Sequence, residues 1–302
     1  MNINALRDSD DNAGFYAAVS SSMASWPGAV IYQSSDNGAS YQMLSAFTTR
    51  ATMGRTVGAL GDYGGGNTVD ELNTVTVSLM HGTLSSVSYA ALLAGAQAAL
   101  IGNEVVYFRD AVLVSEGRYM LSGLLRGRRG TEAAMASHAT GDRFVLLTTA
   151  ALQRIAQDTA DIGKTRLYKC VTSGGQLSGV VAQSFQNEGA ALKPYAPVHL
   201  GGGREADGAL ALSWVRRTRL SGEWRDNVDA PVSEASESYE VEIYSAGFAG
   251  VLRTITGLSA PSVTYSAAQQ VADFGGVQSS VCVRVYQLSA IVGRGYPASA
   301  TI

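Results

Sequence analysis

Short apolar runs that alternate with polar residues, separated by Gly, Asn, Asp and Ser, dominate the chain. Thr74–Met80 is the clearest case, and its alternation predicts a strand with one buried face. Two Ala- and Leu-rich stretches, Ser88–Ala99 and Ala150–Gln157, instead predict short helices. The other strands predicted before residue 192 are Ala29–Gln33, Tyr41–Phe47, Glu104–Phe108, Asp110–Val114, Arg118–Leu125, Asp142–Leu147, Arg166–Cys170 and Val180–Phe185.

The best-defined turn contains Asp36, Asn37 and Gly38, between the first two of these strands. Asn-Gly is a strong hairpin signal, because both residues tolerate positive φ. The segment from Ser34 to Tyr41 also fits the S-x-D-x-G-x-T-W "Asp-box" pattern, with Tyr in place of Trp. We expect the Asp to accept turn amides and the aromatic ring to pack beneath. One copy predicts a well-built turn, whereas glycosidase propellers carry several.

A domain junction is predicted at Lys193–Pro197, because each proline restricts the preceding residue to extended geometry. Gly201–Gly203 follows as a loose spacer or turn. We therefore expect a β-rich region at 1–192, with submodules at about 1–85 and 86–192, and a second domain at 193–302.

The second domain has the pattern of a β-sandwich, with turn signals about every 8–12 residues. Trp214, on an alternating strand, supplies a large core residue. The predicted strands are Ala209–Val215, Glu237–Tyr244, Gly250–Ile255, Ser262–Tyr265, Val281–Leu288 and Ala298–Ile302. The predicted fold class is therefore mainly β, with one or two short helices in the N-terminal region.

The chain contains few charged residues. The chain has 302 residues and a net charge of −3, which gives no bulk attraction to nucleic acid or to anionic membranes. Charged residues make up 16% of the chain, against about 25% in a typical soluble domain. Such a surface suits burial by neighbours in an assembly. Arg greatly outnumbers Lys, which fits an interface, although genomic base composition gives the same skew.

Membrane and secretory features are not predicted. Met1–Asn12 is polar and acidic, unlike a signal peptide. The longest apolar stretch, Tyr89–Ile101, contains Gly and Gln and is too short to cross a bilayer. Cys170 and Cys282 are expected to be buried, reduced thiols in different domains, since two cysteines make no disulfide framework. We expect synthesis in a cytoplasm.

Catalytic and metal-binding patterns are also lacking. His81, His138 and His199 are too far apart for the short spacing of a zinc site, and each is interpreted as a surface or turn residue. Gly163-Lys164-Thr165 ends like a phosphate loop, but the first required Gly is Asp158. No carboxylate pair stands out as a general acid and base. The sequence therefore predicts no enzyme, no cofactor and no metal.

The densest cationic cluster holds Arg126, Arg128 and Arg129, interrupted by glycines. Glu132 and Asp142 lie close enough in sequence to pair with them. One interpretation is structural, with Arg side chains tying a loop to carboxylates and backbone carbonyls. The other is a contact with a second subunit or partner.

A second charged stretch alternates Arg with two Trp residues, and its candidate binding residues are Arg217 and Trp224. Arg beside Trp permits cation–π stacking. The segment is either a solvated hairpin rim or a recognition edge of the sandwich.

The run Leu121–Glu132, followed by His138 and Gly141–Phe144, resembles phage-tail and gene-transfer-agent "host specificity" tail-tip proteins, in their C-terminal portion. These are large tail hub proteins related to the baseplate hub. The likeness extends from about Gly14 to Ile302. Its further segments are Pro194–Val198, Leu212–Arg219, Glu223–Asp226, Glu237–Val241 and Val285–Ala290.

The resemblance implies a structural component of the tail tip or baseplate hub, with a fibronectin type III-like last domain. It implies a homotrimer in the virion tail, assembled in the host cytoplasm, with hub, distal tail and fibre subunits as partners. It also implies a host surface receptor as a partner, and it implies neither nucleic-acid binding nor stable insertion into a membrane. Family members usually have a long N-terminal portion, so this chain is interpreted as a split product or a separate short subunit.

Two alternatives remain open at this point. The first is a receptor- or glycan-binding module at the tail tip, because the chain has 14 Tyr and 3 Trp residues for stacking. The second is a hydrolase of envelope polymers, which needs the convergent carboxylates that the sequence does not reveal.

Overall fold

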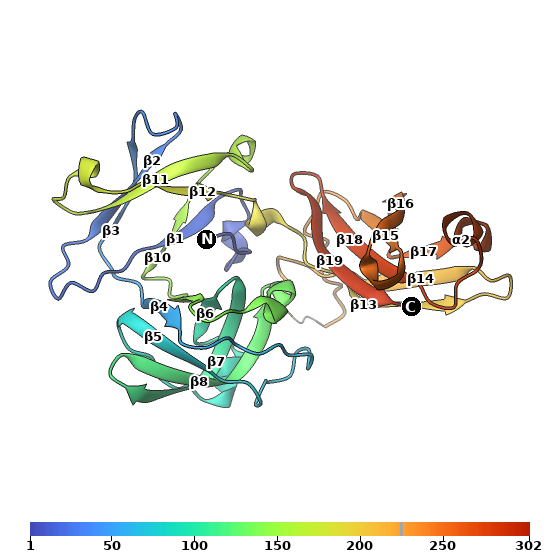
Figure 1. Ribbon diagram of the computed structural model, residues 1–302, viewed down its shortest axis with the longest axis horizontal. Coiled ribbons are helices and arrows are strands. Elements are labelled where there is room, and N and C mark those ends of the chain that lie inside the picture. The colour runs from blue at the N-terminus through green and yellow to red at the C-terminus, as the bar shows by residue number, and fades with distance from the viewer. Residues whose placement is uncertain (224–225) are drawn as a thin grey trace. The chain divides into compact units, whose positions relative to one another are not determined.

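The computed structural model describes residues 1–223 and 226–302, and the protein is mainly β (Figure 1). It divides into two compact units. Unit 1 contains Met1–Asn4 and Asn12–Ala191, and unit 2 contains Ala5–Asp11 and Leu192–Ile302. Unit 2 thus begins one residue before the expected boundary at 193, and it also takes in an N-terminal segment that the sequence did not predict there.

A closed barrel forms the centre of unit 1. Its strands are β4 (Met53–Thr56), β5 (Val75–His81), β6 (Ala98–Ile101), β7 (Glu104–Ser115), β8 (Arg118–Arg128) and β9 (Arg143–Leu146), in the order β4-β5-β8-β7-β6-β9. Its interior is apolar, and its largest fully buried side chains include Phe108, Phe144 and Leu121. The expected division at about residue 85 is wrong, because β4 and β5 close the barrel by pairing with β9 and β8.

Glycine permits the closest strand approach in this barrel. A Cβ on Gly54 in β4 would overlap the carbonyl oxygen of Ser78 in β5. The two strands can pair at this spacing only with a residue that lacks a side chain.

Two further sheets complete unit 1. A two-stranded sheet pairs β1 (Phe15–Ala18) with β10 (Leu152–Ile155). A four-stranded sheet has the order β12 (Gln183–Gln186), β11 (Thr165–Thr172), β2 (Ala29–Ser34) and β3 (Gln42–Phe47). The β2–β3 hairpin was predicted, and strands overlapping β11 and β12 were predicted as well. The helix predicted at Ala150–Gln157 is wrong, because this segment is extended and pairs in register with β1.

The other predicted helix, Ser88–Ala99, is mostly wrong. Only α1 (Tyr89–Leu93) is helical, with the Ser88 side chain accepting a hydrogen bond from Ala91 N. Gly95 and Gln97 then adopt positive φ angles of 87° and 56°. This left-handed backbone ends the helix, and the chain continues as strand β6.

Unit 2 is a β-sandwich of a three-stranded and a four-stranded sheet. The first has the order β13 (Val198–Arg204), β14 (Leu210–Val215), β17 (Ser262–Tyr265). The second has the order β16 (Val251–Leu258), β15 (Tyr239–Tyr244), β18 (Cys282–Ser289), β19 (Gly293–Thr301). Trp214 packs in the core edge-to-face with Tyr239, at 5.2 Å between ring centroids. This is a fibronectin type III-like arrangement.

Two details of unit 2 differ from the prediction. Gly201–Gly203 is part of strand β13 and pairs with β14, instead of forming a spacer. Helix α2 (Ala267–Phe274) was not predicted, although Ser266 and Gln269 form a capping box at its start and Gly275 ends it. The remaining elements are short 3₁₀ segments: η1 (Asp8–Asp10), η2 (Glu132–Ser137), η3 (Thr159–Asp161), η4 (Leu177–Gly179), η5 (Ala190–Leu192) and η6 (Ala246–Phe248).

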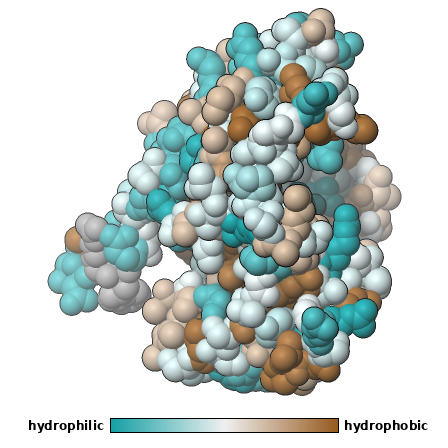
Figure 2. Space-filling model, turned by 90° about the vertical axis from the view of Figure 1, so that its left-hand side faces the viewer, coloured by the Kyte–Doolittle hydropathy of each residue, from teal (hydrophilic) through white to brown (hydrophobic). Residues whose placement is uncertain are grey.

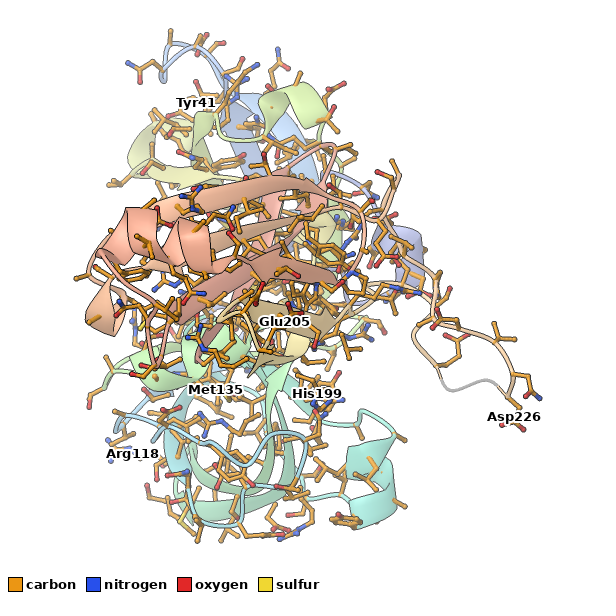
Figure 3. All side chains as sticks on the ribbon, turned by 90° about the vertical axis from the view of Figure 1, so that its right-hand side faces the viewer. Tyr41, Arg118, Met135, His199, Glu205 and Asp226 are labelled. Atoms are coloured by element: carbon orange, nitrogen blue, oxygen red, sulfur yellow. The ribbon has the colours of Figure 1, made fainter. Side chains whose placement is uncertain are left out.

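The Asp-box prediction for the β2–β3 turn is confirmed. Asp36 Oδ1 accepts hydrogen bonds from Ser34 Oγ at 2.7 Å and from Ser40 N at 3.0 Å. These bonds, led by the Ser40 hydroxyl, hold the pKa of Asp36 well below its ordinary value. Tyr41 lies at this hairpin (Figure 3), and its ring is covered by the ammonium of Lys169 at 4.8 Å.

Candidate functional site: a buried ionic network in the barrel

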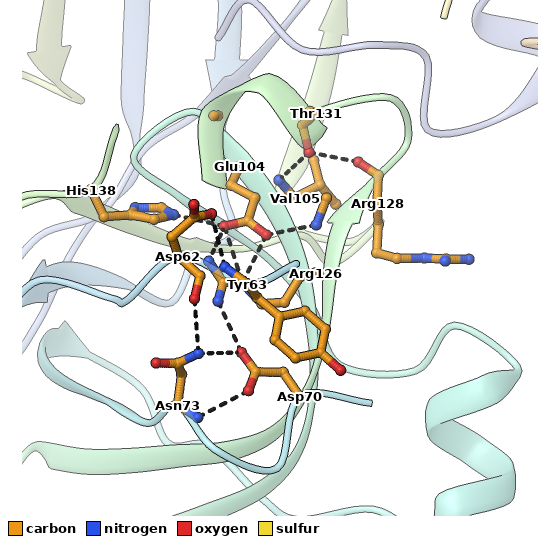
Figure 4. Close-up of polar contacts among 12 residues, drawn as sticks. Asp62, Tyr63, Asp70, Asn73, Glu104, Val105, Arg126, Arg128, Thr131 and His138 are labelled. Atoms are coloured by element: carbon orange, nitrogen blue, oxygen red, sulfur yellow. Dashed lines mark hydrogen bonds and ion pairs between the residues drawn. The ribbon is translucent and has the colours of Figure 1, made fainter. Parts of the chain in front are cut away.

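Arg126, near the end of β8, lies at the centre of a buried ionic network (Figure 4). Its side chain is fully buried and bonds two carboxylates. Nε and Nη2 donate to Glu104 at 2.9 and 3.0 Å, and Nη1 donates to Asp70 at 3.0 Å. Nη1 also donates to the carbonyl of Gly61 at 2.9 Å. The guanidinium thus joins strands β7 and β8 to the loop between β4 and β5.

Glu104, the first residue of β7, accepts hydrogen bonds from three residues. Besides Arg126, it accepts Gly127 N at 2.6 Å and pairs with His138 Nε2 at 2.7 Å. Burial alone would raise the pKa of Glu104, but the hydrogen bonds from His138 and Arg126 outweigh it and the pKa is lowered. The carboxylate therefore stays ionised inside the barrel end.

Asp70 closes the loop between β4 and β5. Its backbone pairs with Leu124 in an isolated β-bridge, with N–O distances of 2.7 and 3.0 Å. Its fully buried carboxylate accepts Asn73 Nδ2 at 2.8 Å in addition to Arg126. Burial would raise the pKa of Asp70, yet the bonds from Asn73 and Arg126 hold it below the ordinary value.

His138 is the other basic side chain of the network. Nε2 lies 2.7 Å from Glu104, Nδ1 lies 2.9 Å from Asp142, and the side chain is 2% exposed. Burial would lower the pKa of His138, but the bonds to Glu104 and Asp142 outweigh it and the pKa is raised. The interpretation of His138 as a surface or turn residue is wrong, because two carboxylates and burial fix its ring.

The structure separates the three predicted arginines. The prediction of Arg126 as a partner contact is wrong, because its side chain has no exposed surface. Arg128 lies over the ring of Tyr107 at 5.5 Å and donates to Asn67 Oδ1 at 3.3 Å. Arg129 has a φ of 56° and lies in the turn after β8. The structural interpretation of the cluster therefore holds for Arg126, and no contact with another chain is shown for Arg128 or Arg129.

The expected carboxylates are not the partners of Arg126. Asp142 pairs with His138, and the partners of Arg126 are Glu104 and Asp70. Glu104 could have been suspected from the sequence, because it begins an otherwise apolar strand. Asp70 gave no such signal, since it lies 56 positions from Arg126.

The second predicted pair lies in unit 2. Arg217 is stacked over the ring of Tyr195, with its Cζ 5.0 Å from the centroid. Trp224 lies outside the described residues. The recognition edge formed by this pair therefore stays a prediction.

The sandwich carries a second cluster of aromatic and cationic side chains. On the four-stranded sheet, Arg284 lies over Tyr244 and Phe248 at 4.7 and 5.1 Å, and Arg294 lies over Tyr286 at 4.7 Å. Alternate residues of β15 and β18 fill the core, so these side chains lie on the opposite, outer face. Arg with Tyr is a composition enriched in protein interfaces.

Other candidate features are limited. In 1–223 and 226–302, no group of three or more His, Cys, Asp and Glu side chains is placed to hold a metal ion. Within the same ranges, every helix is too short or too polar to span a bilayer. Both cysteines are free, but Cys170 is exposed, contrary to the prediction, and Cys282 is buried. On the face in Figure 2, hydrophobic residues form small patches separated by polar ones.

Comparison with known proteins yields one family match. A family model described as "Rcc01698-like, C-terminal" matches residues 51–145, about a third of the chain. The matched range runs from the start of the barrel to its last strand, and it includes every residue of the ionic network. No curated protein gives a significant match.

Two solved structures show a distant likeness to this chain. Domains d3–d4 of the rat CD45 extracellular region are 12% identical, with 47% of this chain and 64% of that chain covered and a TM-score of 0.27. Chicken CNTN1 FN1–FN3 domains are 16% identical, with 81% and 66% covered and a TM-score of 0.27. This chain therefore spans just under two thirds of each. The sandwich assignment depends on its strand order, and the barrel with its ionic network is the part of this chain that is similar to the Rcc01698-like, C-terminal family.

Proposed function

We propose that this chain is a structural component of the tail tip or baseplate hub of a phage or phage-like particle, contributing to tail assembly and host attachment. The proposal starts from the resemblance carried by Leu121–Glu132, His138 and Gly141–Phe144. In the proposal the chain belongs to the virion tail as a homotrimer, is assembled in the host cytoplasm, and contacts hub, distal tail and fibre subunits.

One observation carries the proposal: the residues of this resemblance are used for architecture. Arg126 and His138 pair internally with Glu104, Asp70 and Asp142, and their side chains are almost entirely buried. A buried ionic network suits a rigid module better than a site that exchanges substrate with solvent. The proposal therefore assigns assembly, and no catalysis, to the chain.

The test is the position and copy number of the chain in assembled particles. Particles purified from a producing culture should contain the chain by mass spectrometry, and antibody labelling in electron micrographs should mark the tail end. The free protein should have the mass of a trimer by native mass spectrometry. A chain that is monomeric and absent from purified particles would contradict the proposal.

A receptor- or glycan-binding role is the second candidate, and the outer face of the sandwich favours it. Arg284, Arg294 and Tyr286 combine charge with flat rings in a preorganised stack, which suits a protein or sugar surface. The full chain should bind host cells, and Arg294→Ala should weaken binding at least fivefold, because its side chain is 44% exposed. The control is Arg118→Ala at an exposed turn of the barrel. Equal binding by both variants would argue against this face.

A further inference from the structure

The connection between β8 and β9, residues Arg129–Asp142, is bound to the barrel end through His138. Both ring nitrogens face carboxylates, Nε2 that of Glu104 and Nδ1 that of Asp142. A neutral imidazole carries only one N–H, so it can donate to one of the two. Only the imidazolium donates to both, and the observed geometry is therefore that of the protonated ring.

The charges around the ring depend on that proton. Glu104 faces it from β7 and Asp142 from the start of β9, while Arg126 of β8 lies beyond Glu104 and is itself paired with Asp70. With His138 protonated, two cations face three carboxylates, and the net charge of these five side chains is −1. After deprotonation only the Arg126 cation remains. The three carboxylates are then less compensated, although the Asp142 side chain is only 21% exposed and the side chains of Glu104 and Asp70 are fully buried. A buried, uncompensated charge is strongly destabilising.

Further attachments lie toward both ends of the connection. At one end Thr131 Oγ1 accepts Val105 N at 2.9 Å. At the other, Thr56 N donates to Asp142 O at 2.9 Å, and Thr56 Oγ1 donates to Ala139 O at 3.2 Å. Between these ends η2 has no buried residue. Met135, labelled in Figure 3, lies on this turn. His138 is thus the buried side chain that holds the middle of the connection.

We propose that protonated His138 is an alkaline-sensitive latch, which holds residues 132–140 on the end of the barrel and releases them when the imidazolium loses its proton. The two ends at Thr131 and Asp142 remain attached, so the release is local. The latch is closed where His138 is protonated and its two carboxylate partners are ionised. It opens as the pH rises through the raised pKa of the folded protein, because a raised His pKa gives stability that alkali removes.

The first experiment measures the protonation state of His138 directly. The full chain, labelled with ¹⁵N at histidine, is titrated from pH 5.5 to 9.5 by NMR, with His81 and His199 as internal references. We expect both ring nitrogens of His138 to be protonated at pH 6, and the ring to lose its proton above the ordinary histidine pKa of about 6.5. A ring that loses its proton at or below pH 6.5 would overturn the proposal, whatever the variants show.

The second experiment measures the release of residues 132–140 from the barrel end. Hydrogen exchange of peptides from 132–140, corrected for the chemical exchange rate, should show protection that falls by up to about tenfold per pH unit between the ordinary histidine pKa of about 6.5 and the raised pKa of His138, and that levels off above it. Peptides from β14 and β18 should not change. His138→Gln should abolish this pH dependence, whereas His199→Gln, in β13, should retain it. Protection at 132–140 that is constant from pH 6 to 9.5 in the unmodified chain would overturn the latch, even if His138→Gln fails to fold.

Discussion

Replacement of Arg126 by Met tests the stabilising role of the barrel network. Methionine keeps an unbranched apolar stem but removes the charge, which leaves Glu104 and Asp70 buried without their guanidinium partner. Removal of one partner of a buried pair costs about 3–5 kcal/mol. The low end applies here, because Glu104 keeps His138 and Gly127 N, and Asp70 keeps the bonds from its own loop. We expect a loss of about 3 kcal/mol, or roughly a 150-fold larger opening constant.

The assay is native-state hydrogen exchange of peptides from β5, β7 and β8 in the full chain. Exchange resolves the barrel separately from the sandwich, which a single unfolding curve of a two-unit protein does not. Arg118→Met is the matched control, since this arginine is exposed and its change should cost less than about 0.5 kcal/mol. A loss below about 1 kcal/mol for Arg126→Met would refute the inference that the buried ion pairs hold the barrel end together.

Three further outcomes follow from the structure. Hydrogen-exchange protection of the barrel should decline below about pH 4. The lowered pKa of Glu104 gives stability that is present above the unfolded-state pKa of about 4.3 and is lost on acidification. Constant protection down to pH 2.5 would contradict this. Gly54→Ala should cost about 2–3 kcal/mol by calorimetry, because its Cβ overlaps Ser78 O, and an unchanged melting temperature would disprove the close approach. Arg219→Leu should make Ala5–Asp11 sensitive to limited proteolysis, because the ion pair between Arg219 and Asp11 at 2.9 Å is lost. Equal cleavage of the variant and the unmodified chain would contradict this role of the ion pair.

The strands were largely predictable, because their alternation is a local property of the sequence. Thr74–Met80 and the Asp36 hairpin appear where the pattern puts them. The errors arose where tertiary pairing overrides a local preference. Leu152–Ile155 lies in an Ala-rich segment that suits a helix, yet it pairs with β1. Gly201–Gly203 lacks side chains that favour a strand and is held extended by β14.

The ionic network was predictable only in part. The Arg-rich run indicated that arginines tie a loop in place, and Arg126 does so. Its partners could not be inferred, because Glu104 and Asp70 lie 22 and 56 positions away, and only barrel closure brings them together. His138 gave no signal either, since a single histidine in a turn is chemically ordinary until two carboxylates surround it.

The early segment Ala5–Asp11 has a consequence for how the chain reaches its native state during synthesis. It belongs to unit 2, and Asp11 pairs with Arg219, 208 positions later. A ribosome therefore releases this segment long before its binding surface exists, while the whole intervening barrel can fold by itself. The sandwich unit is completed only when the two distant pieces meet, so an alteration near residue 8 should delay maturation of the far end of the protein and leave the barrel largely untouched.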